Sequence, residues 1–167
     1  MKRLASIWER NFLYFEFLLC LIMSIFFSIW IFTFNGFAFL EIFLQGNRSA
    51  LYGAIASIFG SLLGFIITAT SIVLGFSSSE RLAVVRESKQ YGALWKTFIS
   101  TIRSLAFATI TALVCLLIDR DNNTSRTLLA IMFFLFILSL FRVARSIWAM
   151  ENIILLVTHS PPKRAPS

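Results

Sequence analysis

The chain has 167 residues, of which 58% are hydrophobic, and its mean hydropathy of +0.83 excludes an ordinary soluble domain. The formal net charge of +7 does not indicate nucleic-acid binding, because the basic residues cluster between long apolar runs. Those apolar runs occupy residues 11–34, 51–76, 97–118 and 127–148. Each is long enough to cross a bilayer as a helix of roughly 20 residues. The sequence therefore predicts an all-α integral membrane protein, an antiparallel bundle of four transmembrane helices.

The distribution of basic residues predicts the topology. Lysine and arginine are frequent before the first run and between the second and third runs, and four more (Arg142, Arg145, Lys163 and Arg164) end the chain. The other two loops hold only Arg48, and Arg120 with Arg126. Basic flanking residues are retained in the cytoplasm, so we expect both termini and residues 77–96 on that side. We expect one membrane domain over residues 1–157 and a disordered cytoplasmic tail over residues 158–167, which holds all three prolines.

The two loops expected outside the cell differ in character. Residues 37–44 are apolar apart from Glu41, a pattern that favours a short amphipathic helix in the membrane interface. Residues 119–126 predict a tight hairpin that is too short to host a separate site.

Small residues recur every three or four positions along the second run. They are Gly53, Ser57, Gly60, Gly64, Thr68, Ser71 and Gly75. This spacing keeps them on one face of a helix, where small residues let neighbouring backbones approach closely. The third run repeats the spacing with Ser100, Ser104, Ala108 and Cys115. The pattern predicts either packing of the second helix on the third, or an oligomer seam or pore-facing stripe.

Ionisable residues inside the runs form a second pattern. Glu16, Arg103 and Arg142 each lie roughly 8–10 Å from the expected cytoplasmic boundary, and Arg145 is slightly shallower. A carboxylate in the membrane is costly unless it is paired, so we expect Glu16 beside Arg103 or Arg142. The layer is either a static ion pair with snorkelling arginines, or a hydrated vestibule or gate.

The cytoplasmic segment 77–96 is the one substantial polar stretch. Its basic residues Arg81, Arg86 and Lys89 predict contact with anionic lipid headgroups or with a cytosolic protein. Signals for catalysis are absent from the sequence: the single histidine lies in the tail, and Cys20 and Cys115 fall inside predicted spans. We therefore expect neither an enzyme nor a bound cofactor or metal.

Residues 65–92 read FIITATSIVLGFSSSERLAVVRESKQYG. This segment resembles the middle of the RexB family of lambdoid phage exclusion proteins, in which a small-residue second span runs into a basic loop. The residues that carry the likeness are Arg81, Leu82, Arg86, Glu87, Tyr91 and Gly92. The resemblance implies a small, four-span protein of the bacterial inner membrane, and an association with an ion channel that depolarises the infected cell.

Two functions are compatible with these residues. The first is an oligomeric ion channel or depolarising effector in phage exclusion or abortive infection, which requires a homo-oligomer because four spans barely enclose a pore. The second is a non-conducting membrane anchor, sensor or accessory subunit that recruits a cytosolic partner through residues 77–96.

Overall fold

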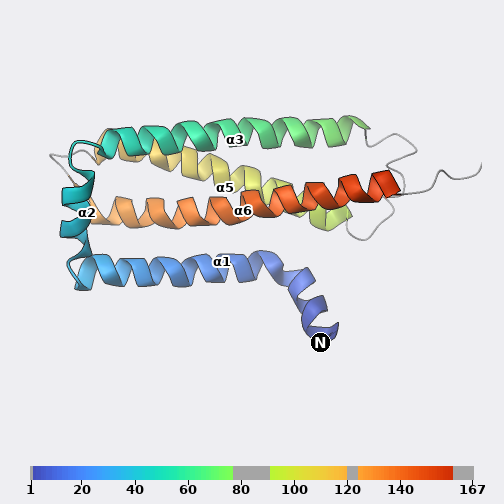
Figure 1. Cartoon of the computed structure of the whole chain (residues 1–167), viewed down its shortest axis with the longest axis horizontal. Coiled ribbons are helices and arrows are strands. Elements are labelled where there is room, and N and C mark those ends of the chain that lie inside the picture. The colour runs from blue at the N-terminus through green and yellow to red at the C-terminus, as the bar shows by residue number, and fades with distance from the viewer. Residues whose placement is uncertain (1, 77–90, 120–123, 160–167) are drawn as a thin grey trace, which may run out of the picture.

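The computed structural model describes residues 2–76, 91–119 and 124–159, and this part of the chain is helical without strands. The helices are α1 (Lys2–Thr33), α2 (Gly36–Leu44), α3 (Arg48–Phe76), α5 (Tyr91–Ile118) and α6 (Arg126–His159). All but α2 contain a segment long and apolar enough to cross a membrane. The predictions of an all-α fold, of four spans and of a multi-pass membrane protein are confirmed (Figure 1).

The helices extend beyond the apolar runs from which they were predicted. Helix α5 begins at Tyr91 rather than at residue 97, and α6 continues past residue 148 to His159. Backbone hydrogen bonding continues a helix after its apolar run has ended, so hydropathy marks the membrane and not the helix. Residues 158 and 159, expected in a disordered tail, are the last of α6, and residues 160–167 lie outside the described residues.

The four long helices pack as a row of antiparallel neighbours (Figure 1). Helix α5 packs between α3 and α6, and α1 packs on the side of α6 away from α5. The first residues of α1 and the last of α6 lie at one end of the bundle, which we call the terminal end. Helix α2 crosses the opposite end, which we call the α2 end, and it has the predicted helical conformation.

From Ala108 onward, the inward face of α5 is made mainly of small residues and receives large ones from its neighbours. Ala108, Ala112 and Cys115 are each 0% exposed, in one core with Tyr52 and Phe59 of α3. Small side chains on a central helix let the flanking helices approach closely, which is how membrane helices gain packing energy. The core of the bundle therefore follows α5.

Aromatic rings join α1 and α3 to α6. Phe27 of α1 stacks on Phe133 of α6 with ring centroids 3.8 Å apart. Phe59 of α3 meets Phe136 of α6 with centroids 5.5 Å apart. Offset ring pairs add to the dispersion energy of the interface, so the many phenylalanines of this sequence also serve packing inside the bundle.

The corner between α1 and α2 depends on two small local features. Asn35 has a φ of 53°, in the left-handed region that asparagine tolerates better than most residues. Gly36 follows, and a Cβ atom at this position would lie 2.5 Å from the Trp30 ring. The chain can therefore turn sharply out of α1 and lay α2 across the end of the bundle.

Candidate functional site

Glu16 forms a buried ion pair with Arg142 near the terminal end. The Arg142 Nη1 atom donates to Glu16 Oε2 at 3.1 Å, and the Arg142 and Glu16 side chains are 7% and 12% exposed. Arg142 Nη2 donates to the Leu13 carbonyl oxygen, also at 3.1 Å. Of the two partners that the sequence allowed for Glu16, the structure selects Arg142, and the pair joins α1 to α6.

Two pairs of hydroxyl groups lie between α5 and α6, and one of them contacts the backbone of Arg142. The Thr101 hydroxyl lies 3.1 Å from the Arg142 carbonyl oxygen and 2.7 Å from the Ser146 hydroxyl. Ser104 and Ser139 join their hydroxyls at 3.0 Å. All four hydroxyl residues are buried, and buried polar groups that satisfy one another rigidify a core. The α5–α6 interface therefore contains two internally satisfied hydroxyl pairs.

The other two arginines of the predicted charge layer do not join this pair. Arg103 is exposed on α5, at nearly the same depth as Thr101 and Arg142. The Arg145 guanidinium lies over the Phe12 ring at 4.0 Å and over the Trp148 ring at 4.9 Å, both favourable cation–π distances. Of the four charges in the predicted layer only Glu16 and Arg142 meet, so the layer is not a single site.

A second buried ion pair lies at the α2 end, where the sequence led us to expect no site. Arg48 Nη1 lies 3.2 Å from Asp119 Oδ2, and the two side chains are 1% and 0% exposed. Asp119 also accepts hydrogen bonds from the Tyr52 hydroxyl and, at 2.7 Å, from the Ser125 backbone N–H. One carboxylate therefore ties the start of α3, the end of α5 and the approach to α6 together.

Helix α2 covers this network. The Phe37 ring faces the Arg48 guanidinium at 5.8 Å and the Arg126 guanidinium at 4.8 Å. Thr124, in the hairpin, donates to Glu41 Oε1 at 2.9 Å. The segment expected to form a short hairpin contributes its first residue, Asp119, to this ion pair, and residues 120–123 lie outside the described residues. The sequence did contain a signal for this ion pair, because Arg48 begins the second span and Asp119 follows the third, at the same expected side of the membrane.

The small residues of α3 divide between two environments. Gly53 and Gly60 face α5, where an added Cβ would lie 3.9 Å from Leu116 and Thr109 respectively. The rest are exposed on the outside of the chain: Ser57, Gly64, Thr68, Ser71 and Gly75. We call these five residues the outward stripe. The α3–α5 contact is therefore made mainly by large α3 side chains and small α5 side chains, and not by the stripe.

Two predicted features need separate mention. The basic residues Arg81, Arg86 and Lys89, expected to contact lipid or a cytosolic partner, lie outside the described residues. Cys20 and Cys115 are free and fully buried, on α1 and α5, as expected of packing residues.

The fold and the two ion pairs define a multi-pass helical membrane protein in which buried charges fasten α1 to α6 and α3 to α5. In comparisons with known protein families, with curated proteins and with solved structures, nothing matches this chain. The resemblance to the RexB family stays a prediction from residues 65–92, and function must be argued from the geometry.

Proposed function

We propose that this chain is a small effector of the bacterial inner membrane that acts as a homo-oligomer, with ions crossing between copies. The observation that carries the proposal is the outward stripe: five small or hydroxyl-bearing residues lie exposed along one side of α3. Lipid contact does not require small residues, whereas close approach of a second helix does. The stripe therefore fits a second copy better than it fits acyl chains.

The interior of one chain supports a path between copies over a path through a copy. Between Ser104 and Asp119, a rise of about 22 Å along α5, the inward residues include Leu105, Ala108, Ala112 and Cys115, each 0% exposed. Ions cross a membrane where water or oriented dipoles replace their hydration shell. The tightly packed centre of α5 offers neither, so conduction needs a surface that a neighbouring copy completes.

The hydroxyls of the stripe suit such a surface. The hydroxyls of Thr68 and Ser71 donate to the carbonyl oxygens of Gly64 and Ile67, each at 2.9 Å. Hydroxyls bonded to their own helix are tolerated in lipid and can turn toward water when an oligomer forms. A Cβ added at Gly64 would meet no neighbouring atom within 4 Å, which leaves room for a partner helix.

A second function is favoured by a different observation. Glu16 and Asp119, the acidic residues buried in the described bundle, are both engaged in ion pairs that join helices. Charges used in this way hold the helices together, and neither of these two carboxylates is free to attract permeant cations. A non-conducting anchor, sensor or accessory subunit would then recruit its cytosolic partner through residues 77–96.

Reconstitution separates these functions. We expect purified protein in liposomes to dissipate a potassium diffusion potential, read with a potential-sensitive dye. Gly64→Leu should lower the rate at least tenfold and weaken association in cross-linking. Ala144→Leu, which introduces a leucine at an exposed site on α6, should change neither.

The contrary results are equally specific. Failure of correctly inserted wild-type protein to dissipate the potential, with no depolarisation of expressing cells with or without phage challenge, would remove the channel proposal. The anchor function would then be tested by whether Arg81→Gln with Arg86→Gln abolishes capture of a cytosolic protein in cells.

A further inference from the structure

Arg103 is a charged residue at membrane depth that the bundle does not use. It is exposed, and within the described part of the chain it forms no hydrogen bond, ion pair or ring contact. Its neighbour Thr101 contacts the Arg142 carbonyl oxygen, so Arg103 lies at the depth of the Glu16–Arg142 pair. A guanidinium at this depth is costly without an anionic partner or water, so its partner must come from outside the described helices.

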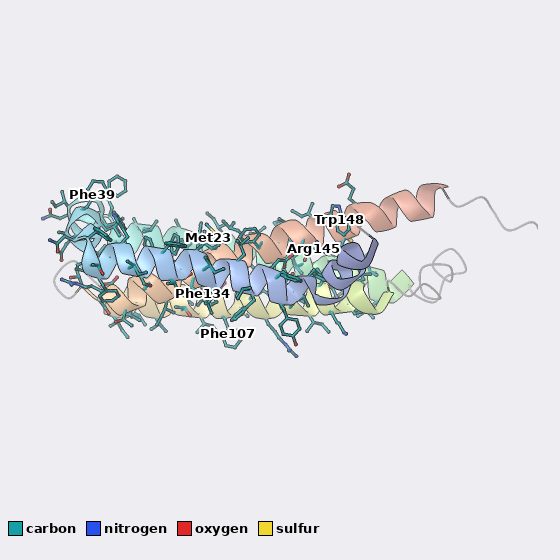
Figure 2. All side chains as sticks on the ribbon, turned by 90° about the horizontal axis from the view of Figure 1, so that it is seen from below. Met23, Phe39, Phe107, Phe134, Arg145 and Trp148 are labelled. Carbon is teal, nitrogen blue, oxygen red and sulfur yellow. The ribbon has the colours of Figure 1, made fainter. Side chains whose placement is uncertain are left out.

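The surroundings of Arg103 form a continuous face on α5. Exposed residues follow one another at helical spacing: Lys96, Ile99, Arg103, Phe107, Ile110, Val114 and Leu117. The two basic residues lie toward the terminal end, and the face is apolar from Phe107 onward. Figure 2 shows Phe107 directed away from the bundle. The face is therefore positively charged near the terminal end of the bundle and apolar along the rest of α5.

This arrangement matches the chemistry of a phospholipid. Lys96 and Arg103 are seven residues apart, about 10 Å along the helix, so both side chains can converge on one group between them. Arginine extends its charged end toward the membrane surface and binds phosphate oxygens in a bidentate manner. We propose that Lys96 and Arg103 hold the phosphate of an anionic phospholipid whose acyl chain lies along Phe107, Ile110 and Leu117.

A second copy of this chain is a poorer occupant of the same face. Among the described residues, Glu16 is the only carboxylate at this depth, and Arg142 already holds it. The other carboxylates of the described helices lie toward the ends of the bundle, with Asp119 and Glu41 at the α2 end, Glu9 in the first turns of α1, and Glu151 beyond Trp148. The spans of a neighbouring copy thus supply no counter-charge for Arg103, whereas an anionic headgroup does. This lipid face is on α5 and is separate from the outward stripe on α3.

Lipid binding to the full-length protein tests the proposal. In a neutral detergent, native mass spectrometry should show tighter binding of phosphatidylglycerol than of phosphatidylcholine. Arg103→Gln and Lys96→Gln should each weaken phosphatidylglycerol binding about five-fold, the worth of one basic residue at an anionic surface. Arg103→Lys keeps the charge and should retain most of the binding. Arg145→Gln is the matched control, because that guanidinium is already engaged by Phe12 and Trp148.

Four results would overturn the proposal. Unchanged phosphatidylglycerol binding by Arg103→Gln would remove the site, as would an equal loss in Arg145→Gln. Displacement of the lipid by soluble glycerol phosphate would show an anion site without an acyl-chain surface. A change in oligomeric state with lipid binding intact would identify a second copy as the partner of Arg103.

Discussion

Arg48 and Asp119 are 71 residues apart in sequence and 3.2 Å apart in the structure, where both are almost completely shielded from solvent. Their ion pair joins the first residue of α3 to the residue that follows α5. With Tyr52 and the Ser125 N–H, every oxygen of the carboxylate has a donor. This network is what organises the α2 end of the bundle.

Removing one charge from this network should be costly. Asp119→Asn leaves the Arg48 guanidinium buried beside a neutral group, and breaking such a pair costs about 3–5 kcal/mol. Thermal unfolding in detergent should show a large loss of stability. The Arg48→Gln, Asp119→Asn double variant should recover part of it, and Glu41→Gln, an exposed carboxylate at the same end, should have little effect. A wild-type melting temperature for Asp119→Asn would contradict the role assigned to the pair.

The Glu16–Arg142 pair makes a parallel prediction for the terminal end. Glu16→Gln should lower abundance and thermal stability, because the Arg142 guanidinium then loses its counter-charge and keeps the Leu13 carbonyl oxygen. Adding Arg142→Gln should restore part of the loss. Adding Arg103→Gln should not, since Arg103 does not touch Glu16. Equal rescue by both arginine changes would mean that the stability lost in Glu16→Gln comes from long-range charge repulsion and not from the broken Glu16–Arg142 contact.

Packing at the centre of α5 and on the outward stripe should respond differently to added bulk. Ala108→Leu places further carbons in a site that is 0% exposed and should cost about 1–3 kcal/mol. Gly64→Leu should change the free energy of unfolding of a single chain by no more than about 0.5 kcal/mol. Its main effect should be to weaken association between copies. Unfolding in detergent below the concentration of association measures the first effect, and cross-linking measures the second. Comparable destabilisation by both would place the stripe inside the fold.

Topology can be tested with introduced thiols. The native Cys20 and Cys115 are fully buried, so background labelling should be low. A membrane-impermeant maleimide applied to intact cells should label Asn47→Cys and leave Glu151→Cys unlabelled. Both positions are exposed in the structure and lie at opposite ends of the bundle. Labelling of Glu151→Cys alone would invert the orientation predicted from the basic residues.

The sequence predicted the spans because hydropathy alone decides which segments enter a bilayer. It also placed Glu16 beside one of two arginines, since few partners exist at that depth. The Arg48–Asp119 pair escaped prediction because both residues sit at span ends, where charges are ordinarily solvated. Only the tertiary arrangement, with Phe37 laid over Arg48, shows that these two are buried.

The sequence also could not predict which neighbour the small residues of α3 face. Periodicity establishes that Gly60 and Gly64 are close on a helix, but not which neighbour that face meets. In the structure Gly60 lies beside Thr109 of α5, and Gly64 faces outward one turn later. Helix rotation depends on the sizes of both partners, and here the large Tyr52 and Phe59 side chains set it.

The two ion pairs also constrain the order in which the protein can be built. Synthesis runs from the N-terminus, so Glu16 and Arg48 enter the membrane before the ribosome has made Asp119 and Arg142. Arg48 gains its counter-charge only when Asp119 has been made at the end of α5, and Glu16 gains its own only with Arg142 of α6. The two ion pairs can therefore form only as α5 and α6 are made, so the last two spans complete the bundle at both ends. A chain interrupted before α5 would lack the counter-charges of both Glu16 and Arg48, so neither ion pair could form.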